Sequence, residues 1–420
     1  MLIEFRVKNF RSIREEQCLS LVASKDKDHC TTHLASTGIP GIPHLVKSAV
    51  LYGANASGKS NIINALLFMK GVVMNSSTSL EGQKFNYSHF KLDAEFSKQP
   101  SEFEVTFVNQ GVRYQYGFSL LPDRVAEEWL LVYKSAKPQA WFSRSIDHHT
   151  GKDRYNFSTH LTGQRKVWQE STRTNVLFLS KAVDLNSEQL RPIFLWFAEN
   201  LMIIPVGHQP INDFSVEYAQ TEEGKNELLK FLINADLSIS NLSFEKKKLK
   251  KVDLHFGVGK EPSQQLTDVE VSFPKFLHQA EKGVAEFEFQ DESTGTQKFF
   301  AFAGPILNVM KHGSTLVVDE LDGSLHTFLV RLLIKYFHSS DINMLGSQLI
   351  FSTHDTALLD TSIFRRDQIW FVEKDRAQAT KLYPLTQFSP RKNEALERGY
   401  LMGRYGAIPF FSNSELLERK

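Results

Sequence analysis

The chain contains little cysteine and no long apolar run. Cys18 and Cys30 are the only cysteines among 420 residues, which is too few for a disulfide-built secreted domain and fits a reducing compartment. No apolar run reaches the roughly 18 residues that a transmembrane helix requires. Glu4, Arg6 and Lys8 interrupt the first ten residues, so these form neither a signal peptide nor a membrane span. We therefore expect a cytoplasmic protein without membrane contact.

An excess of one charge, heptad repeats and paired zinc ligands are also lacking. The net charge of +1 at pH 7 argues against a nucleic-acid signature spread over the chain, and a local basic patch stays open. The helical stretches 164–200 and 222–233 sustain no apolar heptad, so no long arm is predicted. His29, Cys30 and His33 lack a second ligand pair, and we interpret them as a solvated loop.

The chain does contain a loop that is typical of phosphate binding. Residues 53–60 read GANASGKS, between an apolar run (48–52) and a helix-forming stretch (61–70). The pattern G-x-x-x-x-G-K-[ST] needs a strand, a turn and a helix, because backbone N–H groups must converge on phosphate oxygens at a helix N-terminus. Several residues in and beside this loop are therefore candidates for binding ATP: Gly53, Asn55, Gly58, Lys59, Ser60 and Asn61.

Each fixed residue of the loop has a distinct chemical task. The two glycines allow the turn conformations and the close approach of backbone to phosphate. Lys59 is expected to reach the β- and γ-phosphates, and the Ser60 hydroxyl is expected to bind Mg²⁺.

Two carboxylates follow a second apolar strand. Residues 314–320 read STLVVDE, the pattern of a strand that is buried on both faces of a parallel sheet. Because ligands bind at the carboxyl edge of such sheets, Asp319 can meet the Mg²⁺ held by Ser60. Glu320 is then free to polarise a water aimed at the γ-phosphate, as a general base must.

Two further segments carry candidate residues. Residues 348–354 read QLIFSTH, a third buried strand, and His354 at its carboxyl end can contact the γ-phosphate or the attacking water. Residues 291–298 read DESTGTQK and precede an apolar helical stretch (299–309). A Ser/Thr/Gly turn at a helix start is an anion site, and taken alone it is equally a plain helix cap.

The remaining segments suggest the organisation of the chain. Residues 2–9 alternate as a half-buried strand does, and 24–43 are predicted to be a loop. Three β-rich runs (102–108, 112–120 and 125–134) predict an antiparallel β-meander. The basic run 244–251 is either a solvated face or a nucleic-acid contact. We divide the chain into residues 1–135, a mixed insertion with helical segments (136–280) and residues 281–420.

In this order, the phosphate loop, STGTQ, LVVDE, LDGSLH (321–326) and STH resemble the motif series of ABC-type ATPase heads of the SMC and RecF class. FRVKNFRSI (5–13) is similar to the opening of these proteins, and it places Arg11 near the nucleotide. Segments 369–375 and 398–409 look like the AAA-named ATPases of bacterial phage-defence and abortive-infection modules. The resemblance implies an α/β fold: an ABC-type P-loop head with mixed and parallel sheets, a β-meander and a helical insertion.

The resemblance also implies a composite site. In this class the signature turn of a second head completes the site, so that Ser293, Gly295 and Gln297 would face the nucleotide held by another copy of the chain. Asp322 in the D-loop would link the two sites. ATP and Mg²⁺ are the implied cofactors, and His354 becomes the switch histidine.

The sequence leaves two functions open. The first is an ATPase that dimerises through ATP and controls a separate toxic effector, probably a nuclease, in antiphage defence. It is suggested by complete ATPase motifs together with the lack of an acidic cluster typical of a nuclease. The second is a RecF-like repair or recombination ATPase that binds DNA through Lys246 to Lys251. The chain departs from SMC heads in that no coiled coil separates the phosphate loop from the signature.

Overall fold

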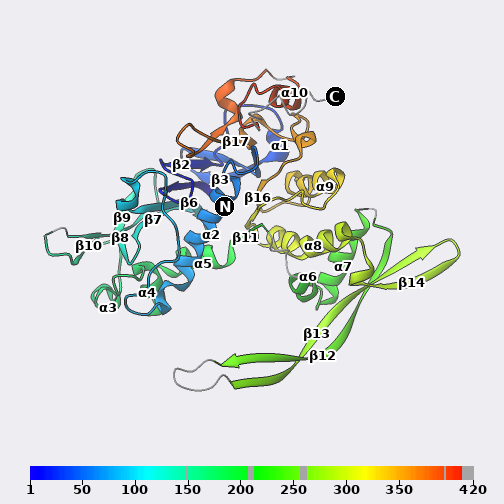
Figure 1. The fold of residues 1–420 in the computed structure, drawn as a ribbon, viewed down its shortest axis with the longest axis horizontal. Helices are drawn as coiled ribbons and strands as arrows, with labels where there is room; N and C mark the ends of the chain where they lie inside the picture. The colour runs from blue at the N-terminus through cyan, green and yellow to red at the C-terminus, as the bar shows by residue number, and fades with distance from the viewer. Residues whose placement is uncertain (148, 207–211, 236, 256–262, 392–393, 409–420) are drawn as a thin grey trace, which may run out of the picture. The chain divides into compact units, whose positions relative to one another are not determined.

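The computed structural model describes residues 1–420 except 148, 207–211, 236, 256–262, 392–393 and 409–420 (Figure 1). The chain forms two compact units. The first unit comprises Met1–Gly207, Val309–Gly323 and Val330–Lys420, and the second comprises His208–Asn308 and Ser324–Leu329. No helix among the described residues is both long and apolar enough to cross a membrane.

A six-stranded sheet forms the centre of the first unit, in the order β11-β15-β16-β5-β17-β18. All neighbours pair in parallel except β17 and β18. The three central strands are buried along their whole length, because both faces of the sheet are covered. The strand bounds are β5 Ser48–Tyr52, β11 Leu201–Ile204, β15 Thr315–Val318, β16 Gln348–Ser352, β17 Ile369–Lys374 and β18 Thr380–Pro384.

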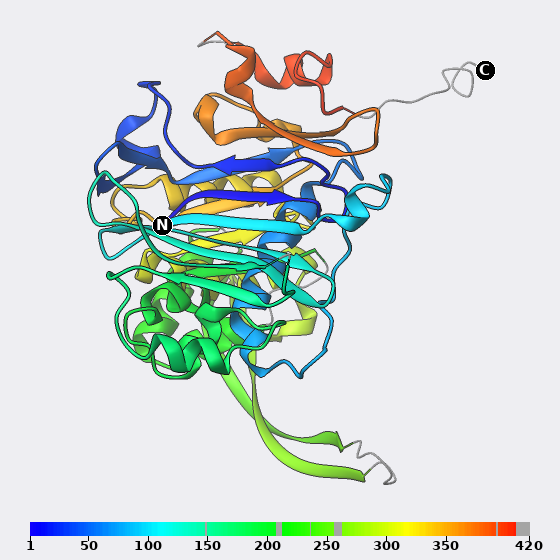
Figure 2. The same ribbon diagram turned by 90° about the vertical axis from the view of Figure 1, so that its left-hand side faces the viewer.

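An antiparallel seven-stranded sheet forms the second layer of this unit, in the order β10-β9-β8-β7-β6-β1-β2 (Figure 2). It contains the predicted meander, in which β6, β7 and β8 pair in sequence. The strand bounds are β1 Leu2–Lys8, β2 Gln17–Ser20, β6 Ser101–Asn109, β7 Val112–Leu121, β8 Arg124–Tyr133, β9 Gln139–Ile146 and β10 Asp153–Phe157.

One hydrophobic core joins the two sheets and the helices packed on them. Helix α2 (Lys59–Asn75) contributes Ile62, Leu66 and Met69, which recur at three- and four-residue spacing. Phe107 stacks on Trp196 at 4.0 Å between ring centroids, which joins the meander to helix α5 (Arg191–Glu199). The helices predicted between 164 and 200 are confirmed as α3 Arg165–Ser171, α4 Phe178–Asp184 and α5 Arg191–Glu199.

The expectation that residues 24–43 form a loop is wrong. The segment contains the short helix α1 (Cys30–His33) and the antiparallel hairpin of β3 (Leu34–Ile39) and β4 (Ile42–Val46). Buried and exposed residues alternate along β3, but one of the buried residues is Thr37, and the Ser, Thr and Gly residues concealed the pattern. The solvated-loop interpretation also fails for His33, which is buried.

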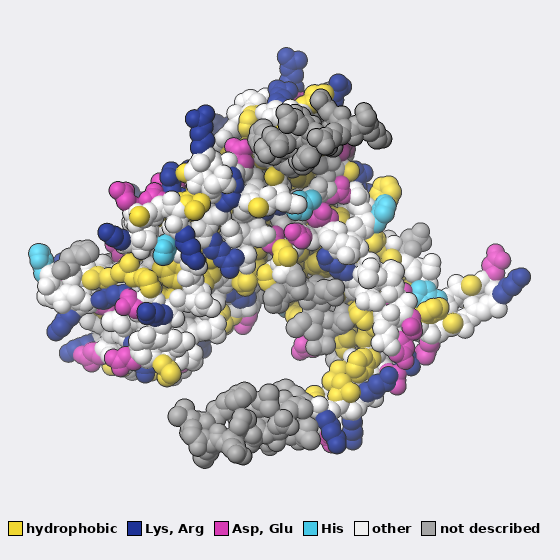
Figure 3. All heavy atoms as spheres, in the orientation of Figure 1, with side chains coloured by type: hydrophobic (Ala, Val, Ile, Leu, Met, Phe, Trp, Pro, Cys, Tyr) yellow, Lys and Arg dark blue, Asp and Glu magenta, His cyan; other side chains and the backbone are white. Residues whose placement is uncertain are grey.

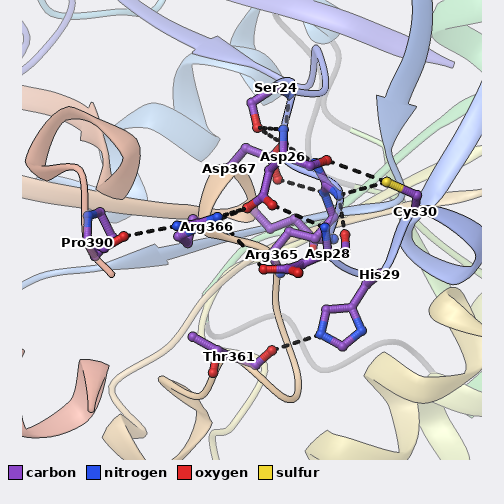
Figure 4. Close-up of polar contacts among 11 residues, drawn as sticks. Ser24, Asp26, Asp28, His29, Cys30, Thr361, Arg365, Arg366, Asp367 and Pro390 are labelled. Carbon is purple, nitrogen blue, oxygen red and sulfur yellow. Dashed lines mark hydrogen bonds and ion pairs between the residues drawn. The ribbon is translucent and has the colours of Figure 1, made fainter. Parts of the chain in front are cut away.

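Polar contacts attach this segment to a turn more than three hundred residues away. The backbone N–H and hydroxyl of Ser24 donate to Asp367, whose carboxylate also accepts from Arg365 (Figure 4). Arg366 binds Asp26 at 2.7 Å. These charges are satisfied within the protein, as buried ion pairs must be.

The second unit consists of helices and a long β-ribbon. Helices α6 (Asn212–Tyr218) and α7 (Glu222–Ile233) precede the strands β12 (Ile239–His255), β13 (Ser263–Ala280) and β14 (Gly283–Glu288). Strands β12 and β13 pair from Ile239↔His278 to His255↔Ser263, whereas β14 pairs only with Lys275–Ala280 of β13. The expectation of no long arm is therefore wrong. This arm is a β-ribbon, and a search for heptads cannot detect one.

The remaining elements complete the two units. Helix α8 (Thr294–His312) begins in the second unit and ends in the first, and α9 (Thr327–His338) does the same. Helix α10 (Leu396–Leu401) lies near the end of the described chain. Short 3-10 turns occupy Ser76–Thr78, Phe96–Lys98, Phe289–Asp291, Thr356–Leu358, Arg366–Gln368 and Leu385–Phe388.

Candidate functional site

The phosphate loop lies between the central strand β5 and helix α2, as the sequence predicts. Gly58 has φ +112°, and a Cβ at this position would lie 2.1 Å from the Thr380 hydroxyl. A Cβ on Gly53 would lie 2.2 Å from the Val372 carbonyl oxygen. Both positions therefore require glycine, because Val372 of strand β17 and Thr380 of strand β18 pack too closely against the loop to leave room for a Cβ atom.

Lys59 is the first residue of α2, and its side chain is buried. Its Nζ donates to the carbonyl oxygens of Gly53 at 2.7 Å and Ala54 at 3.2 Å, so it folds back over the loop. Burial lowers the pKa of Lys59 to about 8, and the nearby carboxylates of Asp319, Glu320 and Asp322 oppose that shift. Lysine and carboxylates from segments far apart in sequence thus share one electrostatic environment.

The carboxylates follow β15 at the carboxyl edge of the parallel sheet. Asp319 is 5% exposed; its Oδ1 accepts a hydrogen bond from the Ser352 hydroxyl at 2.5 Å. Its Oδ2 is buried and has no hydrogen-bond partner among the described residues. A buried carboxylate oxygen without a partner is costly, and a cation would offset that cost.

Glu320 and His354 lie beside each other at this edge. The distance from His354 Nε2 to Glu320 Oε1 is 3.8 Å, and both side chains are partly exposed. Glu320 has φ +55°, which is unusual for a residue with a side chain. Asp322 Oδ2 accepts from the backbone N–H of His354 at 3.2 Å and so joins segment 321–326 to the loop after β16.

Arg11 is brought to the start of α2. Its Nη1 donates to Asn61 Oδ1 at 3.4 Å, and Asn61 Nδ2 donates to the Ser12 hydroxyl at 2.6 Å. Of the other predicted loop residues, Asn55 is exposed and Ser60 is half-buried as the second residue of α2. The structure thus places the predicted residues of the first unit around one edge of the central sheet.

The predicted signature residues belong to the second unit. The Ser293 hydroxyl accepts from the backbone N–H of Thr296 at 3.1 Å, so Ser293 caps α8. Gln297 Nε2 donates to the Glu292 carbonyl oxygen at 2.8 Å. Ser293 is exposed and Gly295 half-buried. The geometry therefore shows a capped helix start with an accessible turn.

Sequence reasoning missed several polar residues behind the loop. The Thr380 hydroxyl is 2.7 Å from that of Ser12, donates to the Ser57 carbonyl oxygen at 3.0 Å and accepts from Lys374 Nζ at 3.1 Å. Ser352 was also missed. None of these residues lies in a spacing pattern, because Thr380 reaches Ser12 and Ser57 from more than three hundred residues away and Ser352 reaches Asp319 from 33 residues away.

A groove of about 880 Å³ opens beside the phosphate loop. The loop residues Gly53–Ser57, Thr353 and His354 form one side, and Tyr400, Ala407 and Ile408 near the end of the described chain form another. Pro409, the last residue of the phage-defence-like segment, lies outside the described residues.

The basic run lies on the β-ribbon, where acidic residues face it. Lys248 is paired in register with Glu270 and Lys250 with Asp268, and Lys246 Nζ is 3.4 Å from Glu270 Oε2. Figure 3 shows hydrophobic side chains along this ribbon and Lys or Arg side chains toward its end. The Lys251 side chain lies outside the described residues. The cross-strand acids reduce the positive charge that a phosphate backbone would meet.

Comparisons with solved structures found matches of low sequence identity. The matches include an Smc head bound to the C-winged helix domain of ScpA, with 16% identity over 91% of this chain and 97% of that one, at a TM-score of 0.41. A Pyrococcus furiosus Smc head with an extended coiled coil, bound to the C-terminal domain of ScpA, matches at 14% identity, 96% and 98% coverage and a TM-score of 0.41.

A third matching structure is CbiO1 from Clostridium perfringens, part of the ABC transporter complex CbiONQ. It matches at 10% identity over 97% of this chain and 98% of that one, at a TM-score of 0.35. No curated protein matches the chain.

A family model matches residues 48–360, from strand β5 through the phosphate loop, the Asp-Glu pair and His354. The matched region thus contains the loop and carboxylates that meet at the sheet edge. The chain therefore belongs to the family described as "AAA domain, putative AbiEii toxin, Type IV TA system".

Proposed function

We propose that this protein binds ATP with Mg²⁺ at the edge of its six-stranded sheet and hydrolyses it. The observation that carries the proposal is the convergence of Lys59, Asp319 and Glu320 beside a glycine-dependent phosphate loop. Family membership supports the same reaction. Backbone N–H groups at the start of α2 favour an anion there, and Lys59 adds a positive charge.

The donor set suits Mg²⁺. Asp319 Oδ2 is buried without a partner among the described residues, and a hydroxyl is available on Ser60. Carboxylate and hydroxyl oxygens, completed by phosphate oxygens, are the ligands that Mg²⁺ prefers. Bound there, the ion would neutralise charge that develops on the phosphates.

Glu320 is the proposed general base, and His354 the residue that contacts the γ-phosphate or the attacking water. Their separation of 3.8 Å allows both to face one water. Arg11, which is hydrogen-bonded to Asn61 in the first turn of α2, would then lie near the nucleotide.

We further propose that a second copy of the chain completes the site through Ser293, Gly295 and Gln297, and that Asp322 couples the two sites. ATP would then hold two copies together, and hydrolysis would release them, as a nucleotide-controlled switch. The released or assembled state would control a separate toxic effector, with a nuclease as the expected class, in antiphage defence. The toxin–antitoxin wording of the family description supports this role.

The test of the reaction is the variant Glu320→Gln. It should bind ATP as the unchanged chain does and hydrolyse it about 10²–10⁴-fold more slowly, because the amide cannot accept a proton. Phosphate release and binding of a fluorescent ATP analogue measure the two effects. Normal turnover by Glu320→Gln would remove this residue from the base role.

The effector proposal has a separate test. The purified chain should not cleave DNA or RNA in the presence of Mg²⁺, and a nuclease should co-purify with it from the native cell. Mg²⁺-dependent cleavage by this chain alone, persisting in Glu320→Gln, would contradict a separate effector.

A further inference from the structure

The Ser352 hydroxyl holds both proposed catalytic carboxylate residues. Ser352 ends strand β16, and its side chain is fully buried. Its hydroxyl donates to Asp319 Oδ1 at 2.5 Å and accepts from the backbone N–H of Glu320 at 2.8 Å. One hydroxyl therefore reaches the predicted metal ligand and the turn that carries the predicted base.

The neighbouring strands hold the same turn from two sides. The Asp319 N–H donates to the Ile204 carbonyl oxygen of β11 at 3.0 Å, and the Leu321 N–H donates to the Ser352 carbonyl oxygen at 3.1 Å. Between them, the Glu320 N–H has the Ser352 hydroxyl as its acceptor. Three successive N–H groups are thus bound, which stabilises a turn whose middle residue has φ +55°.

These contacts leave a specific part of Asp319 available. Oδ1 is engaged by Ser352, while Oδ2 has no partner among the described residues. A carboxylate that is fixed through one oxygen presents the other in a defined direction, as partners behind a metal ligand do. The same hydroxyl fixes the backbone from which Glu320 extends toward His354.

We propose that Ser352 is a positioning residue that orients Asp319 toward Mg²⁺ and Glu320 toward the attacking water. The inference rests on the proposed ATP hydrolysis. Ser352 does not contact nucleotide or metal itself; it acts through the two residues that do. Its removal should therefore change how strongly Mg²⁺ strengthens nucleotide binding and leave metal-free binding intact.

The experiment compares three full-length variants with the unchanged chain. Ser352→Ala removes the hydroxyl. Ser352→Cys fills nearly the same space with a weak donor, so it keeps the strand packed. Ser347→Ala is the matched control: Ser347 is equally buried, directly precedes β16 at its other end and donates to the Val309 carbonyl oxygen at 2.9 Å.

Affinity for a fluorescent ATP analogue is measured in EDTA and over a Mg²⁺ titration, with thermal melting as the check of folding. Ser352→Ala should bind the analogue normally in EDTA and lose about 10- to 100-fold of the Mg²⁺-dependent gain in affinity. Its turnover should fall by a similar factor. Ser352→Cys should lie between Ser352→Ala and the unchanged chain, and Ser347→Ala should match the unchanged chain.

The two proposals fail in different ways. If either folded Ser352 variant shows the Mg²⁺ dependence and turnover of the unchanged chain, the positioning role is wrong. An equal loss in Ser347→Ala would also overturn it, because the effect would then be one of general strand stability. If the unchanged chain itself shows no Mg²⁺-stimulated ATP hydrolysis, the proposed function fails instead.

Discussion

At the scale of single residues, Lys59 combines burial with a positive charge. Its Nζ is held by the carbonyl oxygens of Gly53 and Ala54, and burial lowers its pKa to about 8. Phosphate oxygens offer a stronger partner than these carbonyls, because they carry negative charge that attracts the ammonium, whereas a carbonyl oxygen belongs to a neutral group. Nucleotide binding should therefore depend strongly on Lys59.

We expect Lys59→Ala to weaken ATP binding by at least about 100-fold, because two charge-assisted hydrogen bonds contribute about 1.5–3 kcal/mol each. Titration calorimetry measures the loss. Lys70→Ala is the matched control, since Lys70 lies on the same helix α2 and its pKa is also lowered by burial. Retained affinity in Lys59→Ala would refute the phosphate-loop assignment.

The sequence was informative for residues that chemistry requires at fixed spacing. The phosphate loop, Asp319 and Glu320 follow from such patterns, and the structure brings their segments together at one sheet edge. Ser352 and Thr380 could not be predicted, because a serine at a strand end and a threonine beside a lysine have many equivalent roles. Two structural facts distinguish Ser352 and Thr380 from other serines and threonines of the chain. Strand β16 pairs with β15, and Thr380 of β18 lies against the phosphate loop.

At the scale of elements, a buried pair of histidines joins α1 to α9. His33 is 5% exposed and stacks on His338 at 3.6 Å between ring centroids. Burial lowers the pKa of His33 to about 4, with His29, Arg365 and Lys47 adding to the effect, and burial also places the pKa of His338 well below its ordinary value. Both rings are therefore neutral in the folded protein near pH 7.

These histidines predict a loss of stability in acid. Between pH 6.5 and about 4 the unfolded chain binds more protons than the folded one, so stability is full above pH 6.5 and falls as the pH drops. At pH 5 the loss from His33 should be about 2 kcal/mol. Urea unfolding of His33→Gln at pH 7 and pH 5 should show a pH difference smaller by that amount. His44 is exposed, and the control variant His44→Gln should keep the full pH difference of the unchanged chain. An unchanged difference in His33→Gln would exclude this source of acid sensitivity.

The β-ribbon of the second unit is an element that the sequence did not predict. Its lysine-rich strand lacks the apolar alternation of a half-buried strand, because Glu245 is half-buried and the side chains of residues 246–250 are exposed. Its anchors are Leu242 and Phe276, which are paired in register and fully buried. By contrast, the meander strands alternate clearly and were predicted within one or two residues.

Removing the outer ribbon should leave the nucleotide site intact. We expect a variant in which an Asn-Gly turn replaces residues 245–273 to bind ATP with unchanged affinity and to melt within a few degrees of the full chain, since it retains the buried anchors. Phe276→Ala, by comparison, should destabilise the protein by about 3–5 kcal/mol. Loss of ATP binding on removal of the ribbon would show that this element supports the site.

At the scale of the whole molecule, the motifs are divided between two compact units. The phosphate loop, Asp319 and His354 belong to the first unit, and the capped turn at Ser293 belongs to the second. The order of the motifs, through its resemblance to ABC-type heads, suggested that the phosphate loop and the signature turn play separate parts in one site. If a second copy supplies the turn, two chains must associate when ATP is bound. Association between chains is measured on the protein in solution.

Substitutions at Ser293 test that association. In the Glu320→Gln background, where ATP persists, we expect ATP-dependent dimers by light scattering. Ser293→Arg should spare nucleotide binding and abolish these dimers by its bulk. Ser293→Asp keeps the helix cap, because aspartate accepts the Thr296 N–H as serine does, and should abolish them by repelling the γ-phosphate.

Ser240→Arg is the control, since Ser240 is exposed on the same unit and lies outside the turn. It should dimerise normally. Loss of dimers in both Ser293 variants, with melting temperatures preserved in Ser293→Asp, would separate a phosphate contact from a folding defect. Dimers that persist in both variants would mean that the turn is only a helix cap, and that ATP joins the chains elsewhere or not at all.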